Sequence, residues 1–140
     1  MKTFRAPRNA LRVCVWCVGV VVVELGLYAS YRGHDARFHW ATHFLVGASA
    51  ALIVMTIVAR RRRAPVRAPL VWIVAAHLYA MIPDLLFNSG EIHRRWMDVF
   101  LGHVATHFVP GRNWTWYAVF LVNSAAYLIT VDRVARADPT

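Results

Sequence analysis

Histidine is the residue type in this sequence whose spacing points most directly to chemistry. Among the seven histidines, two pairs are four residues apart: His39 with His43, and His103 with His107. Residues i and i+4 of a helix share one face, so each pair would present two imidazoles about one turn apart. Two imidazoles at that spacing reach one zinc ion in known metal-binding helices. Two such pairs in one short chain therefore indicate a candidate metal site.

An acidic residue accompanies the histidines. Asp84 follows Pro83 in the apolar run HLYAMIPDLLF. Proline removes a backbone hydrogen bond and kinks or ends a helix. The hydrogen-bond pattern of the helix is therefore interrupted next to the Asp84 carboxylate. A carboxylate in or beside a membrane span is costly unless it has a partner or a role. We favour Asp84 as a metal ligand over a solvated residue at a helix end.

The polar stretch that follows contains three further candidate site residues. His93 is a candidate ligand, and the neighbouring Arg94 is suited to bind the anion of a phosphoester or lipid substrate. Asp98 is a candidate general base. The alternative is that this stretch is a solvated face in contact with phosphate headgroups.

Four long apolar runs must position these residues. The chain has 140 residues, of which 59% are hydrophobic, a fraction typical of a membrane bundle. Runs of about 18–20 residues are long enough to cross a hydrocarbon core about 30 Å thick. These runs occupy residues 13–31, 40–59, 70–87 and 114–131. The sequence thus predicts an all-α polytopic membrane protein, with residues 1–140 forming a single integral membrane domain.

The segment between the third and fourth runs is too short to cross. Residues 99–109 would span only about half of the hydrocarbon thickness as a helix. We therefore predict one interfacial helix over about 91–108, lying along the outer surface and ended by Pro110 and Gly111.

The basic residues orient the four spans. With both termini in the cytoplasm, eleven of the 16 basic residues lie on the cytoplasmic side, five of them in the segment RRRRAPVR. The net charge of +9 is therefore explained by topology and headgroup contacts, and we expect no nucleic-acid partner. Six of the seven histidines fall on the outer side. His77 alone lies deep in a span, where Glu24 of the first span is its predicted partner.

Three pieces of the chain also resemble a known family. THFLVGASAA, AMIPDLL and HRRWMDVFLGHVATH, within residues 38–107, resemble the YdjM-like family of bacterial inner-membrane proteins, described as membrane-bound metal-dependent hydrolases. By position, His43 matches the family's first histidine, Asp84 the first acid of its PDxD motif, and His93 its HR motif. Leu86 replaces the second acid, and the family's GxTHS continuation is missing. The resemblance implies a multi-pass protein of the bacterial inner membrane.

Three functional hypotheses remain open from the sequence. In the first, a divalent metal, zinc, activates water at the outer membrane face for attack on a lipid-like ester or phosphoester. In the second, histidines on facing helices ligate a haem or another cofactor. In the third, the protein is non-catalytic, with interfacial histidines and lipid-binding arginines. The metal ligands expected in the first hypothesis are His39, His43, Asp84, His93, His103 and His107.

Overall fold

The described part of the chain forms four long helices and two short ones. A computed structural model describes residues 6–30, 36–90, 92, 94–106, 108–111 and 113–137. The helices are α1 (Ala6–Ser30), α2 (Ala36–Arg62), α3 (Pro69–Asn88), the 3-10 helix η1 (Arg95–Val99), α4 (His103–Thr106) and α5 (Asn113–Ala137). α1, α2, α3 and α5 are each long and apolar enough to cross a membrane. The prediction of an all-α protein with four transmembrane helices is confirmed.

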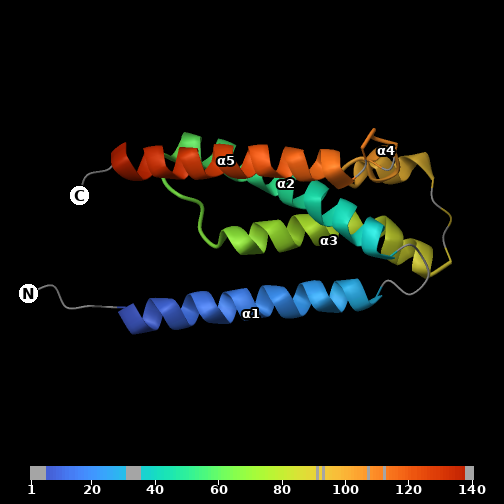
Figure 1. The fold of residues 1–140 in the computed structure, drawn as a ribbon, viewed down its shortest axis with the longest axis horizontal. Coiled ribbons are helices and arrows are strands. Elements are labelled where there is room, and N and C mark those ends of the chain that lie inside the picture. Colours follow the sequence, from blue (N-terminus) through green and yellow to red (C-terminus); the bar gives the residue numbers. More distant parts are fainter. Residues whose placement is uncertain are drawn as a thin grey trace, which may run out of the picture.

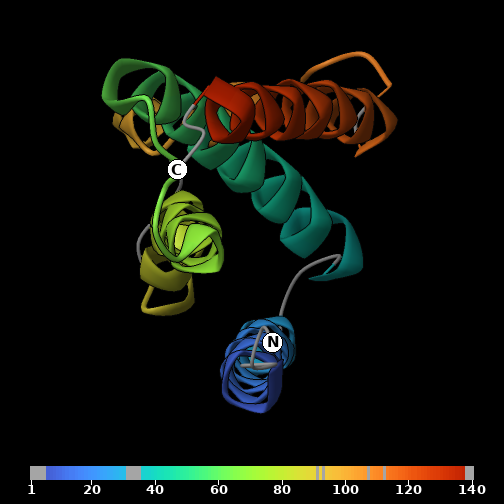
Figure 2. The same cartoon turned by 90° about the vertical axis from the view of Figure 1, so that its left-hand side faces the viewer.

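Helix α2 occupies the centre of the bundle. Consecutive long helices run in alternating directions, so α1 begins and α5 ends at the same end of the molecule (Figure 1). α2 crosses between α3 and α5 and packs against both, whereas α1 lies at the edge with few contacts (Figure 2). Half of the apolar window of α2 is buried, against none of that of α1. α2 is therefore the element against which the other spans are positioned.

α2 and α3 approach each other closely at Gly47. A Cβ atom on Gly47 would lie 2.8 Å from the carbonyl oxygen of Ala76 and 2.8 Å from the backbone nitrogen of His77. Small residues at a helix interface let two backbones approach in this way, and within a membrane such packing supplies much of the association energy. Further along α2, a core cluster that also involves α5 is made of Ala51, Leu52, Met55 and Tyr127.

The segment after α3 is helical in two short pieces, which corrects the prediction of one continuous interfacial helix over 91–108. Leu101 (φ 57°) and Gly102 (φ 69°) both adopt the left-handed conformation, which interrupts the helix between η1 and α4. The Asp98 carboxylate oxygen Oδ1 accepts hydrogen bonds from the backbone N–H groups of Val104 and Ala105, at 2.8 and 3.0 Å. Asp98 thereby satisfies two of the donors that the start of α4 leaves open.

Candidate metal centre

The first two side chains of the candidate site come from α2. His39 and His43 lie one turn apart near the start of the helix, with ring centroids 6.3 Å apart. The i, i+4 spacing places both imidazoles on the face of α2 that α3 covers, and His43 is almost fully buried. The sequence prediction that this pair shares one helix face is confirmed.

Asp84 reaches the same place from α3. The helix continues through Pro83 to Asn88, so Asp84 is not a solvated residue at a helix end. Its side chain is 5% exposed, and its Oδ2 atom lies 3.0 Å from Nε2 of His43. A buried carboxylate needs a partner to offset its loss of hydration, and the His43 imidazole is one.

His103 completes the group from α4. Its Nε2 atom lies 3.2 Å from Oδ1 of Asp84, so each carboxylate oxygen faces a different imidazole. The His43 and His103 rings stack, with centroids 4.6 Å apart and planes only 8° from parallel. Three elements that are distant in sequence thus converge on one buried carboxylate.

Contacts to the neighbouring spans hold the η1–α4 segment in position. The Tyr79 hydroxyl of α3 donates a hydrogen bond to the carbonyl oxygen of Val99, at 3.1 Å. The Trp116 indole of α5 donates one to the carbonyl oxygen of Thr106, at 3.3 Å. Beside His43, the Thr42 hydroxyl donates one to the side-chain oxygen of Asn113 in α5. Sequence reasoning missed these supporting residues, because nothing in their local pattern distinguishes them from other polar residues near a membrane interface.

The donor set suits a divalent transition metal. One ligand atom each from His39, His43 and Asp84 can be chosen so that all lie within 4.8 Å of one another. With bonds of about 2.0–2.1 Å, ligand atoms around a tetrahedral zinc ion are roughly 3.3 Å apart. The 3.0 Å contact between Asp84 Oδ2 and His43 Nε2 is close to that edge length, and it also suits a direct hydrogen bond. Two imidazoles and a carboxylate that lie this close together could hold one metal ion.

The remaining predicted residues have different outcomes. His93 and His107 lie outside the residues that the structure describes. Arg94 is exposed, in extended backbone just before η1. Asp98 caps α4 through Oδ1, a structural role that its prediction as a general base did not include.

A second buried polar pair lies deeper in the membrane-spanning part. Nδ1 of His77 in α3 is 2.8 Å from Oε2 of Glu24 in α1, which confirms the predicted pairing. His77 is completely buried, and the rings of Trp40 and Phe44 from α2 meet it edge to face. Because α1 has few other contacts with the bundle, this pair is a main point of attachment for that helix.

We expect Glu24 and His77 to act as a coupled pair in stability. Glu24→Gln and His77→Gln should each lower the free energy of unfolding, because each leaves the other group buried without its partner. The double variant should lose less than the sum, with a coupling energy of about 1–3 kcal/mol. Unfolding by denaturing detergent in mixed micelles, followed by tryptophan fluorescence, measures these values. As a control, the stability losses of His77→Gln and the distant Arg136→Gln should add in the double variant. If the losses of Glu24→Gln and His77→Gln also added, the pairing would be contradicted.

Comparison with known proteins adds no relative: no protein-family model, curated protein or solved structure matches this chain.

Proposed function

We propose that this protein is a membrane-embedded, metal-dependent hydrolase that binds one divalent cation, zinc, through His39, His43 and Asp84. The observation that carries the proposal is the convergence of these three side chains, from two spans, within reach of a single ion. Imidazole and carboxylate donors in this ratio are typical of catalytic zinc sites, which keep a further position for water or substrate.

In this proposal, His103 orients Asp84 or serves as an alternative ligand. It contacts the Asp84 oxygen that faces away from His43, as partners beyond the ligand shell do when they orient a ligating carboxylate. When bound, zinc would supply an activated water and polarise the ester or phosphoryl oxygen. The chain's own residues would hold Asp84 in place and exclude bulk water around it, since His43, Asp84 and His103 are all buried.

The position of the site favours a lipid-like substrate. The cluster lies near the start of α2 and the end of α3, at the end of the bundle opposite the start of α1 and the end of α5. Because the cluster lies at the ends of two spans, a substrate would meet it at the depth of the lipid headgroups. The exposed Arg94, at the same end, would meet a phosphate headgroup or phosphoester. We assign this end to the outer face of a bacterial inner membrane, with both termini cytoplasmic, because of the arginine distribution and the YdjM-like resemblance.

Elemental analysis of the purified protein tests the metal site. We expect about one equivalent of zinc per chain, and a loss of roughly tenfold or more in His43→Ala, which removes a ligand. His77→Gln is the matched control, because it replaces another fully buried histidine outside the cluster and should retain the metal. Wild-type protein without zinc or another divalent metal, or equal metal in wild type and His43→Ala, would refute the site.

Catalysis needs a separate test, because a metal site can be structural. The metal-loaded protein in vesicles of phosphatidylglycerol should release phosphoester or ester products, and His43→Ala should not. A metal-loaded protein with no turnover on either bond type would contradict the hydrolase and favour the non-catalytic alternative. The haem hypothesis has less support, since the deep histidine, His77, is engaged by Glu24.

A further inference from the structure

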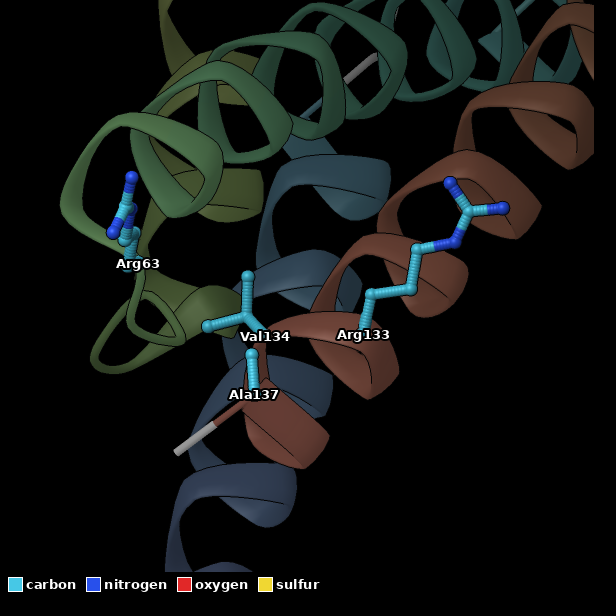
Figure 3. Close-up of a pocket in the computed structure, with 4 residues that line it drawn as sticks. All are labelled: Arg63, Arg133, Val134 and Ala137. Carbon is cyan, nitrogen blue, oxygen red and sulfur yellow. The ribbon is translucent and has the colours of Figure 1, made fainter. Parts of the chain in front are cut away.

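The opposite end of the bundle carries a pocket that the proposed hydrolase does not use. It lies between the final turns of α2 and α5 and has a volume of about 480 Å³. That volume falls within the range of about 300–1,000 Å³ that small-molecule sites occupy. Four residues line it: Arg63, Arg133, Val134 and Ala137 (Figure 3).

The two arginines come from different parts of the chain and stand on either side of an apolar floor. Arg63 directly follows α2, and Arg133 belongs to the last turns of α5. Figure 3 shows Arg63 and Arg133 on opposite sides of Val134 and Ala137, with the guanidinium group of Arg133 directed away from Arg63. Guanidinium groups bind phosphate oxygens through paired N–H donors, and the two small apolar side chains suit a glycerol or acyl group.

The backbone fixes Arg63 in an uncommon conformation. Arg63 has φ 50°, in the left-handed region that few residues other than glycine adopt. Nearby, Arg60 Nε donates a hydrogen bond to the Thr130 hydroxyl, at 3.4 Å, and so ties the end of α2 to α5. A left-handed residue directly after the last helical residue is a common helix end, so Arg63 terminates α2 and its position is set by that turn.

Charge alone does not define this site, because arginines at helix ends also match the helix dipole and the topology of the spans. The same region holds Arg61 and Arg62, both exposed, and Arg136, whose guanidinium pairs with Asp132 at 3.0 Å. What distinguishes Arg63 and Arg133 is that both line one pocket with apolar walls.

We infer that this pocket binds the headgroup of an anionic phospholipid. With rotation of the exposed Arg63 and Arg133 side chains, their guanidinium groups would meet the phosphate, and the glycerol backbone would contact Val134 and Ala137. The location favours a lipid over a soluble anion, since the pocket lies at the ends of two helices long enough to cross a membrane, which is the depth of phospholipid headgroups. The inference is independent of the metal site.

Native mass spectrometry of the full-length protein in detergent tests this inference. Titration with phosphatidylglycerol should show a first bound lipid that is retained more strongly than phosphatidylcholine. The variant Arg63→Gln/Arg133→Gln should weaken that first binding event by roughly thirtyfold, because it removes two arginines that each contribute on the order of 1 kcal/mol near a headgroup. The control Arg61→Gln/Arg136→Gln removes the same charge outside the pocket and should retain wild-type selectivity.

Three results would overturn the site. Equal loss in the two double variants would mean that only the overall positive charge attracts the lipid. Equal retention of phosphatidylglycerol and phosphatidylcholine by the wild type would mean that there is no anionic selectivity. Competition by inorganic phosphate at equal concentration would identify a soluble anion instead. If the glutamine variant fails to fold, Arg63→Lys/Arg133→Lys keeps the charge but loses the paired donors, and should still bind phosphatidylglycerol more weakly than wild type.

Discussion

Replacing Asp84 by asparagine is expected to lower zinc affinity by at least about 100-fold while leaving the metal-free protein folded. Asp84 is the only acid in the cluster of described residues, and its two oxygens face His43 and His103. An amide has nearly the same shape and can still hydrogen-bond one imidazole, so the packing changes little. It lacks the negative charge that offsets the charge of the ion in a low-dielectric site.

Competition with a fluorescent zinc chelator measures the affinity, and detergent-induced unfolding of the metal-free forms measures stability. Asp132→Asn is the matched control, because Asp132 is an exposed carboxylate on α5 that pairs with Arg136; its zinc affinity should equal that of the wild type. An Asp84→Asn protein that binds zinc as tightly as the wild type would show that the carboxylate is not a ligand.

Gly47→Ala is expected to destabilise the protein by about 1–3 kcal/mol, the usual cost of overpacking. The added methyl group would meet the backbone of Ala76 and His77 at 2.8 Å, and backbone atoms cannot move aside as a flexible side chain can. Relief of the clash requires α2 and α3 to separate. Since His43 and Asp84 lie on these two helices, we also expect weaker zinc binding in this variant.

Gly19→Ala provides the comparison for this prediction. A Cβ on Gly19 in α1 would meet nothing within 4 Å, so the methyl group should be tolerated and should add the higher helix propensity of alanine. Unfolding of both variants in mixed micelles measures the difference. Gly47→Ala with the stability and zinc affinity of the wild type would show that the tight crossing is not required.

The parts of the fold that the sequence predicts are those that depend on local pattern. Span number follows from the length and apolar content of each run, and each predicted run overlaps a long helix. The pairing of His39 with His43 follows from helical periodicity alone. Depth along a span is also local information, because it depends only on the position of a residue within its apolar run. The pairing of Glu24 with His77 is predictable for that reason.

The arrangement of the outer segment depends on contacts that no local pattern contains. The break at Leu101 and Gly102 redirects the chain, and the hydrogen bond from Tyr79 to Val99 fixes where the η1–α4 segment lies. Without that break, Asp98 would lie within a continuous helix, with no free N–H groups to cap. The sequence therefore suggested a chemical role for Asp98 where the structure has a cap.

The proposed ligands have a consequence for the biogenesis of this protein. His39, His43 and Asp84 all belong to one helical hairpin, residues 36–88, in which a short connection joins α2 to α3. The chain emerges from the ribosome from its N-terminus, so this hairpin is complete before α5 has been synthesised. The proposed site thus predicts that metal capture can begin during membrane insertion, before His103 and α5 pack against the ligands.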